Sequence, residues 1–358
     1  MYGLWFANIP RLSSAKRQMI LETCHSAQEV YGLSEAAVRA LPGLEEADKE
    51  RILASRREWN LEGEWVRLQE QGVGFVTIEE EDYPKKLLNI HRPPYCLYYL
   101  GSLPEPGRLC VAIVGARGRS AYGAQAARAL AERLAAEQVD IVSGMARGID
   151  ADGHAGALAA GGRTYAVLGC GVDVCYPAAN RFLYENIPAQ GGILSEYPMH
   201  MQPRAELFPQ RNRIIAGLAD CTVVIEAREK SGSLITADCA LEQGRDVYAL
   251  PGRIFDPLSQ GCNALIRQGA GVLTSVEDFV RDLGLSDAAC CERTDFRKNL
   301  LEKSERLVYS LFDFAPLGIG TLVQNSPYGL TEMLEILERL EQKGFVEETA
   351  ANYYIRKK

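Results

Sequence analysis

A small, glycine-bearing loop between two regular segments is the first feature of the chain that could do chemistry. The β-branched run that ends at Ser143-Gly144 is followed by Gly148 and then by the alanine-rich segment 151–160, which is typical of a helix. Glycine permits positive φ angles and a close approach of the backbone to a ligand, and the Ser143 hydroxyl adds a donor. Backbone N–H groups exposed where a helix begins favour an anion. The loop therefore predicts a phosphate-binding site.

A second segment carries Arg211 and Arg213 on either side of Asn212, near the start of another predicted helix. Surface ion pairs with Glu206 or Glu226 would be the purely structural explanation. A function is favoured, because three polar side chains set between apolar neighbours cannot all be displayed to water. Guanidinium groups grip phosphate at two points, so we expect phosphate contacts here.

Other apolar runs are also followed by residues that could donate hydrogen bonds to an anion. Gly115 ends one run and Arg117 comes directly after it, at the kind of strand end where wound sheets bind ligands. Ser231 and Ser233 precede another predicted helix, and Asn263 follows a Gly-Cys pair in a weaker version of the same arrangement. The G-x-G-x-x-G order of a dinucleotide-binding loop is missing. Several separate anion sites predict the successive phosphates of a strand, and no cofactor is expected.

Asp150 and His154 lie four residues apart and would share one face of the helix that follows the first loop. Such a pair could act as an acid and a base, but Asp150 is also well placed as the helix N-cap with His154 packed beside it. The cap is the favoured interpretation, because no third group or nucleophile is tied to the pair. We therefore expect no catalytic residue here.

The composition limits what the chain can be. Its 358 residues, of which 47% are hydrophobic, predict two or three folding units. A formal net charge of −8 excludes a protein that coats nucleic acid with its whole surface, so a nucleic-acid site must be local. In residues 108–284, 16 of the 17 basic side chains are arginines, a bias that suits oxyanion binding.

Ten cysteines raise the question of a metal site. None lies in a C-x-x-C pair, the close spacing that zinc sites use, and Cys110, Cys221 and Cys239 are expected to be buried and reduced within apolar runs. No metal is therefore predicted. No stretch approaches the roughly 20 apolar residues of a membrane span, and the first residues lack a basic signal-peptide segment. These features predict a cytoplasmic protein with no membrane partner.

Residues 1–70 are predicted to form a small helical domain, similar to a SAM or helix-hairpin-helix module. Helical spacing of apolar residues covers 15–24, 34–41 and 46–53. Residues 41–44 resemble the hairpin turn that can hold a DNA phosphate, but the second glycine of such a turn is missing. A packing role is therefore favoured.

Residues 71–284 alternate strands with helices, which predicts an α/β fold around a largely parallel, wound sheet. The predicted strands are 109–115, 139–144, 164–169, 192–195, 221–226 and 246–250, with edge strands at 74–78 and 95–101. The predicted helices are 122–137, 150–160, 235–243 and 263–268.

Residues 285–299 are polar and unpatterned and are predicted to be a linker to a domain over 300–358. Its expected elements are helices at 300–312, near 318–324 and at 330–343, then a hairpin over 345–356. This is the element order of a winged helix. The third helix carries four glutamates, which repel DNA phosphates, so we expect this domain to contact a protein or nothing.

The sequence resembles the DNA-processing protein A family (DprA/Smf), bacterial factors that bind incoming single-stranded DNA during transformation and load the recombinase RecA. The resemblance spans almost all of residues 71–284. It is carried by Tyr83-Pro84 with Leu87, Gly115-Ala116-Arg117, Tyr122-Gly123, Ser143-Gly144 with Ala146, Gly148-Ile149-Asp150, His154, Tyr176-Pro177 with Asn180, Ser195-Glu196, Phe208-Pro209, Arg211 to Ile215, Ser231-Gly232-Ser233, Pro251-Gly252 and Gly261-Cys262-Asn263.

The resemblance implies an extended Rossmann-like domain that binds single-stranded DNA without catalysis, flanked by helical and winged-helix domains. It also implies a homodimer and RecA as a protein partner. Contacts to phosphates predict strong salt dependence and little sequence preference, with Tyr176, Phe182 or Phe208 as possible stacking platforms. The residues expected to bind DNA phosphates are Gly115, Arg117, Ser143, Gly144, Gly148, Arg211, Asn212, Arg213, Ser231, Ser233 and Asn263.

The alternative is a phosphoribohydrolase-like enzyme, because hydrolases that cleave a ribose from a base use the same type of sheet with glycine-rich loops. Such an enzyme needs a positioned carboxylate, for which Glu196 or Glu226 could be nominated. Its glycine-threonine loop with a catalytic glutamate is replaced here by residues 231–238, so binding is favoured over catalysis. A scaffold for other proteins would explain the acidic last helix but not the arginines.

Overall fold

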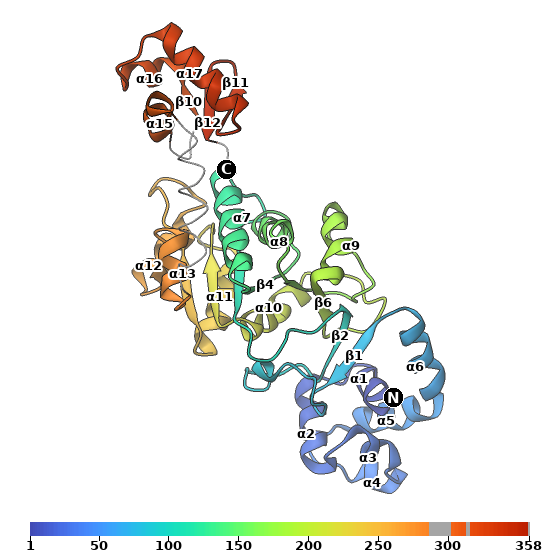
Figure 1. Cartoon of the computed structure of the whole chain (residues 1–358). Coiled ribbons are helices and arrows are strands. Elements are labelled where there is room, and N and C mark those ends of the chain that lie inside the picture. Colours follow the sequence, from blue (N-terminus) through green and yellow to red (C-terminus); the bar gives the residue numbers. More distant parts are fainter. Residues whose placement is uncertain (286–301, 313–315, 357–358) are drawn as a thin grey trace. The chain divides into compact units, whose positions relative to one another are not determined.

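The computed structural model describes residues 1–285, 302–312 and 316–356. The chain divides into two compact units, residues 1–279 and 280–358. The first unit holds a nine-stranded sheet covered by helices, and the second holds a three-stranded sheet with its own helices (Figure 1). Among the described residues, no helix combines the length and the apolar character that crossing a membrane requires.

The large sheet has the strand order β1-β2-β6-β5-β4-β3-β7-β8-β9. Strands β3 to β9 run parallel, while β2 pairs antiparallel with both β6 and β1. The central strands are buried on both faces, as is usual for parallel strands between helical layers. The strands are β1 Gly74–Thr77, β2 Cys96–Gly101, β3 Cys110–Val114, β4 Asp140–Ser143, β5 Thr164–Val167, β6 Gly191–Ser195, β7 Cys221–Val224, β8 Asp246–Ala249 and β9 Gly271–Val272.

The strand order reverses between β3 and β7. The chain passes from β3 to β4 along one side, whereas β7 pairs with the other edge of β3 and leads on to β8. Connections on the two sides of such a point diverge to opposite faces of the sheet, which leaves a crevice at the carboxyl ends of the strands. The fold therefore brings the segments that follow β3 and β7 to one place.

The pleat of β3 decides which helices cover which face. Ala112 and Val114 lie in one core cluster with Ile214 of α10, whereas Ile113 points to the other face and contacts Gly153 of α8. Helix α7 packs on α8, and α11 packs on α10. The pair α7 and α8 therefore covers the face to which Ile113 points, and the pair α10 and α11 covers the face of Ala112 and Val114. The helices are α7 Ala121–Ala136, α8 Ile149–Ala159, α9 Arg181–Gln190, α10 Leu207–Leu218, α11 Gly232–Glu242, α12 Gln260–Arg267 and α13 Val276–Asp282.

Each predicted strand is present within two residues of its expected ends. Helices α11 and α12 begin three residues earlier than predicted, because Gly232 and Gly261 are helical where glycine suggested a loop. The prediction of α/β architecture with a largely parallel sheet is confirmed. Helices α9 and α13 and the two-residue strand β9 were not predicted.

Six helices precede the sheet, twice the predicted number. Phe6 contacts Tyr95 edge-on at a centroid distance of 5.1 Å, and Trp5 contacts Tyr31 at 4.9 Å. Their core is continuous with the β2 edge of the sheet, so these helices belong to the same compact unit. The six-residue helices α1 and α3 were too short to show helical periodicity. The helices are α1 Tyr2–Ala7, α2 Ser14–Cys24, α3 Ala27–Gly32, α4 Glu35–Arg39, α5 Glu46–Glu58 and α6 Leu61–Glu70.

The second unit has a core built from its three main helices and its small sheet. Glu305 is fully buried there and accepts a hydrogen bond from Lys343 at 2.7 Å, with Arg339 at 3.5 Å. Apart from Leu285, the predicted linker 285–299 lies outside the described residues, as do residues 300 and 301 of the helix expected next. The elements are α15 Lys303–Ser310, β10 Leu317–Gly318, α16 Ile319–Gln324, α17 Leu330–Gln342, β11 Val346–Ala350 and β12 Tyr353–Arg356.

Candidate functional site

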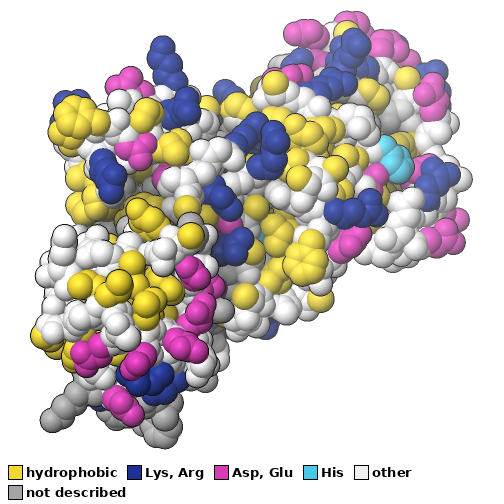
Figure 2. All heavy atoms as spheres, turned by 90° about the horizontal axis from the view of Figure 1, so that it is seen from above, with side chains coloured by type: hydrophobic (Ala, Val, Ile, Leu, Met, Phe, Trp, Pro, Cys, Tyr) yellow, Lys and Arg dark blue, Asp and Glu magenta, His cyan; other side chains and the backbone are white. Residues whose placement is uncertain are grey.

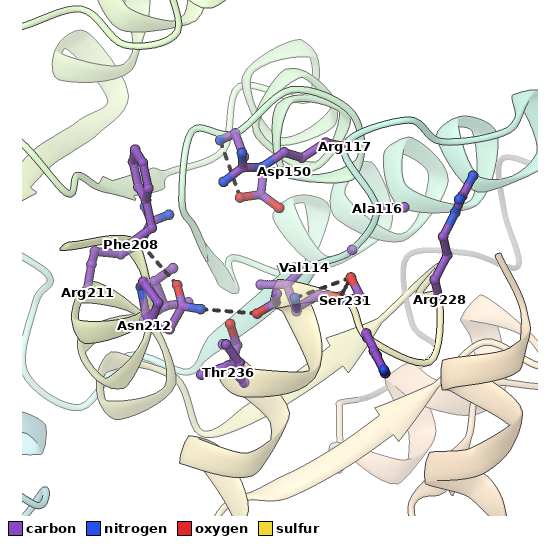
Figure 3. Close-up of a pocket in the computed structure, with 18 of the residues that line it drawn as sticks. Val114, Ala116, Arg117, Asp150, Phe208, Arg211, Asn212, Arg228, Ser231 and Thr236 are labelled. Atoms are coloured by element: carbon purple, nitrogen blue, oxygen red, sulfur yellow. Dashed lines mark hydrogen bonds between the residues drawn. The ribbon is translucent and has the colours of Figure 1, made fainter. Parts of the chain in front are cut away.

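A cavity of about 690 Å³ opens at the carboxyl ends of β3 and β7, where the strand order reverses (Figure 3). One wall is the segment Val114–Gly118, which leaves β3. A second wall comes from Arg228, Lys230 and the first residues of α11, and a third from the start of α10. The position agrees with the rule that wound parallel sheets bind ligands at the switch in strand order.

Besides the buried Arg211, three cationic side chains line the cavity: Arg117, Arg228 and Lys230. Among the residues that the structure describes, no carboxylate lies within 4 Å of any of these three charges. An unpaired cation in a concave site attracts anions more strongly than one already neutralised by a partner. The cavity therefore carries positive charge although the chain as a whole is acidic.

An aromatic pair stands at the edge of this cavity. The rings of Tyr176 and Phe208 are stacked, with centroids 5.7 Å apart and an interplanar angle of 23°. The Arg117 guanidinium lies over the Phe208 ring, 5.5 Å from its centroid, a cation–π contact that fixes the direction of the arginine. The cavity thus combines a cation with aromatic faces, and Tyr176 leaves 42% of its surface exposed.

Arg211 lines the cavity but is almost wholly buried. Its Nη1 donates a hydrogen bond of 2.7 Å to the carbonyl of Gly144 and another to the carbonyl of Val167. Burial lowers the pKa of Arg211, and the nearby Asp150 carboxylate opposes that shift. Arg211 therefore fastens α10 to the ends of β4 and β5, which sequence alone did not indicate.

Asp150 organises the loop that follows β4. Its carboxylate accepts hydrogen bonds from the backbone N–H groups of Gly144 at 3.2 Å and Ala146 at 3.3 Å. Burial raises the pKa of this carboxyl, and the charge of Arg211 lowers it. The prediction that Asp150 caps α8 is wrong: the N-cap residue is Gly148, and Asp150 lies inside the first turn.

His154 does not form an acid–base pair with Asp150. It is fully buried, and its Nδ1 lies 2.6 Å from the Thr164 hydroxyl, which itself donates to the carbonyl of Ile141 at 3.0 Å. Nδ1 must therefore donate to that hydroxyl. Burial lowers the pKa of His154 to about 3, which leaves the imidazole neutral. This histidine supports the sheet and has no access to the cavity.

Asn212 joins two helices at the cavity wall. Its amide donates to the carbonyl of Gly232 at 3.2 Å, and its oxygen accepts from Nε of Arg211 at 3.2 Å (Figure 3). At the start of α11, the Ser231 hydroxyl accepts from the N–H of Ser233 at 3.4 Å. The N–H of Leu234 donates to the Ser231 carbonyl at 3.1 Å, and the Ser231 and Ser233 hydroxyls lie 2.8 Å apart. One hydroxyl of this pair donates to the other, so one O–H group of this wall is left to donate to an anion.

The predicted site residues separate into two groups. Gly115, Arg117, Arg211, Asn212, Ser231 and Ser233 line the large cavity, and Gly144 lines a smaller adjoining one. Four others lie apart: Ser143 donates to the carbonyl of Ile113, Gly148 turns against Ala116 with a φ of 82°, Arg213 pairs with Glu196 at 2.6 Å, and Asn263 exchanges two hydrogen bonds with the backbone of Gly252.

Sequence reasoning missed Arg228 and Lys230 as parts of the site. Lys230 directly precedes Ser231 and Arg228 lies three residues before it, so their place beside a predicted anion site was the available signal. The carboxylates nominated for a hydrolase are engaged elsewhere: Glu196 with Arg213, and Glu226 with the Ser120 N–H at 2.9 Å and its hydroxyl at 2.5 Å. Neither of them lines the cavity.

The molecular surface is mixed in character. On the face shown in Figure 2, several Lys and Arg side chains stand beside exposed hydrophobic ones, and Asp and Glu side chains gather at other places. Within the described part of the chain, no cluster of three or more potential metal ligands occurs. Cys110 and Cys221 are buried and unpaired, as predicted, and Cys239 is partly buried.

Known proteins resemble this chain in the region that contains the cavity. The family model described as DNA recombination-mediator protein A matches residues 74–284. The DNA processing protein DprA of Streptococcus pneumoniae is 46% identical over 206 residues, 58% of this chain and 73% of that protein. Protein Smf of Synechocystis is 43% identical over 242 residues, 66% of this chain and only 60% of that protein.

Two solved structures share the fold. The X-ray structure of DprA from Streptococcus pneumoniae superposes with a TM-score of 0.69 at 35% identity, covering 78% of this chain and 96% of that one. DNA processing protein A from Helicobacter pylori, described for its single-stranded DNA binding mode, gives a TM-score of 0.54 at 31% identity, covering 59% and 95%.

Proposed function

Because this chain belongs to the DNA recombination-mediator protein A family, as its sequence resemblance predicted, we propose that it processes DNA in recombination by binding single strands in the cavity at the ends of β3 and β7. The Helicobacter pylori relative is described by its single-stranded DNA binding mode, which supports this choice of ligand. The binding site that we propose consists of the cavity and its rim. We infer the activity of the whole protein from the same family membership.

The observation that carries the proposal is the set of three cations around one open cavity, Arg117, Arg228 and Lys230, none of which has a carboxylate within 4 Å among the described residues. The hydroxyl pair of Ser231 and Ser233 at the start of α11 adds a donor to them. Such groups hold phosphates without reading base edges, and a flexible single strand can lay successive phosphates along them. A stiff duplex cannot follow a concave wall in this way.

We propose direct phosphate contacts for the predicted residues that line the cavity, with Arg228 and Lys230 added. The predicted residues that make these contacts are Gly115, Arg117, Ser231 and Ser233, of which the two serines share a hydrogen bond of 2.8 Å that leaves one of their hydroxyl hydrogens for a ligand. Ser143, Gly144, Gly148 and Asn263 act instead by shaping the loops, and Arg211 and Asn212 by holding the wall. Arg213 contributes at most long-range charge, because Glu196 neutralises it.

We also propose that the chain acts without catalysis, loads RecA, forms a homodimer and serves natural transformation in the cytoplasm. Family membership supports these functions. The engagement of Glu196 and Glu226 in other contacts supports a binding role over a hydrolase.

We propose that the parts of the chain are a helical domain over 1–70, a Rossmann-like domain over 71–284, a linker over 285–299 and a winged helix over 300–358. The element order α15-β10-α16-α17-β11-β12 supports the winged helix. Its α17 does not suit DNA, because both Arg339 and Lys343 are drawn to the buried Glu305 and the exposed face keeps its glutamates. A protein partner fits that face better.

A titration with fluorescent oligonucleotides of graded length, at several salt concentrations, tests the proposal. Affinity should rise with length until the cavity and its rim are filled, and should exceed that for a duplex of equal length. Each neutralised phosphate of a single strand contributes about −0.7 to the slope of log K against log salt, so three cations predict a slope of about −2. Equal affinity for single strands and duplex, or a slope near zero, would refute the proposal.

A further inference from the structure

One loop of the first unit exposes two large apolar side chains to solvent. The loop covers residues 251–258, between β8 and α12, and at its tip Ile254 is 74% exposed and Phe255 is 89% exposed. Single exposed apolar residues are common on protein surfaces, but a neighbouring pair on one tip, one of them aromatic, is less so. We name residues 253–255 the apolar tip.

The loop is held firmly, so the apolar tip cannot fold back under the protein. At its start, the Asn263 amide exchanges two hydrogen bonds with the backbone of Gly252, at 3.1 and 3.2 Å. At its end, the Asp256 carboxylate accepts from the N–H of Leu258 at 2.9 Å, and the Asp256 N–H donates to the carbonyl of Arg253 at 3.0 Å. Hydrogen bonds therefore hold both ends of the loop that exposes Phe255.

The same loop stands on the rim of the cavity. Leu258 lines the cavity, and its carbonyl accepts from the N–H of Ala227 at 2.7 Å, directly before the cavity cation Arg228. Arg253 within the tip is exposed, and no carboxylate of the described residues lies within 4 Å of its guanidinium. Leu258 thus joins the loop to the cavity wall three residues from Phe255, and Arg253 places a positive charge in the tip beside the aromatic side chain.

We propose that the apolar tip is a second nucleic-acid subsite, on which Phe255 stacks a base of the strand whose phosphates the cavity holds. The inference rests on the proposed function, since it concerns the same strand beyond the cavity. Cationic groups beside an exposed aromatic ring are the arrangement that binds single strands without sequence preference. Arg253 would meet the phosphate next to the stacked base, and Ile254 would cover the other edge of the ring.

The test compares Phe255→Ala, Phe255→Trp and the wild-type chain on two oligonucleotides of equal length, one normal and one with consecutive abasic sites. Losing a stacked base weakens binding about 5- to 150-fold, so Phe255→Ala should lose that much affinity for the normal strand. Phe255→Trp should restore it. On the abasic strand, Phe255→Ala should match the wild-type chain, and the salt slope should not change, because no phosphate contact is lost.

Val66→Ala is the control, because it removes a half-exposed apolar side chain from α6 in the N-terminal helices. Wild-type binding with no effect of Phe255→Ala, or an equal loss on both strands, would overturn the subsite alone. Failure of the wild-type chain to bind any single strand would overturn the proposed function together with it. A change in oligomeric state on Phe255→Ala, measured by light scattering, would assign the tip to contact with a second copy and overturn the inference.

Discussion

Replacing Arg211 by alanine is expected to lower the free energy of unfolding by about 3–5 kcal/mol, the usual cost of removing one member of a buried charged network. The substitution leaves the carbonyls of Gly144 and Val167 without their donor and the buried Asp150 carboxylate without its neighbouring cation. Urea unfolding followed by circular dichroism measures the loss. The affinity for single strands should fall mainly because less of the protein is folded.

Arg211→Lys distinguishes charge from geometry, because an ammonium group cannot reproduce the planar guanidinium that reaches two carbonyls. We expect it to recover only part of the lost stability. Arg57→Ala, at an exposed arginine of α5, is the control and should change stability by less than about 0.5 kcal/mol. If Arg211→Ala kept its stability and lost DNA affinity, Arg211 would be a ligand contact after all.

Replacing Arg117 by alanine should weaken single-strand binding by about 1–3 kcal/mol, a 5- to 150-fold loss, without lowering stability comparably. Arg117 lines the cavity, lacks a carboxylate within 4 Å among the described residues and is directed by the Phe208 ring. The slope of log K against log salt should become shallower by about 0.7, the share of one phosphate. Fluorescence anisotropy at three or more salt concentrations gives both quantities.

Arg67→Ala is the matched control for this experiment. It removes the same charge from an exposed arginine of α6 that is paired with Glu64 at 2.7 Å. Its affinity should stay within about twofold of the wild-type value, because a screened surface charge acts weakly at a distance. An Arg67→Ala loss as large as that of Arg117→Ala would mean that net charge, rather than the cavity, sets the affinity.

The sheet and the edge that holds the site could be predicted from the sequence for a physical reason. Parallel strands buried on both faces are continuous apolar runs, and their ends are marked by residues such as Gly115 and Gly144. Carboxyl ends of parallel strands meet at one edge, so the strand pattern alone was enough to place the loops carrying Arg117 and Ser231 together. The reversal of strand order then fixes where along that edge the cavity opens.

The direction in which each side chain points could not be predicted from the sequence. Arg211, Asn212 and Arg213 follow one another in α10, and successive helical residues are turned by about 100°, so they cannot all face one cavity. Which of them points inward depends on how α10 lies on the sheet. The same holds for the cation–π contact of Arg117 with Phe208, whose partners are far apart in the chain. Tertiary packing also decided that Asp150 holds the loop backbone instead of capping α8.

Photochemical cross-linking tests the location of the single strand most directly. A single-stranded oligonucleotide carrying 5-iodouracil at one position would be irradiated in complex with the full chain, and the joined peptides mapped by mass spectrometry. The account predicts cross-links to the exposed aromatic residues at the cavity, Tyr176 above all, and their loss in the Arg117→Ala variant. Cross-links confined to residues 1–70 or 302–356, with none around the cavity, would contradict it.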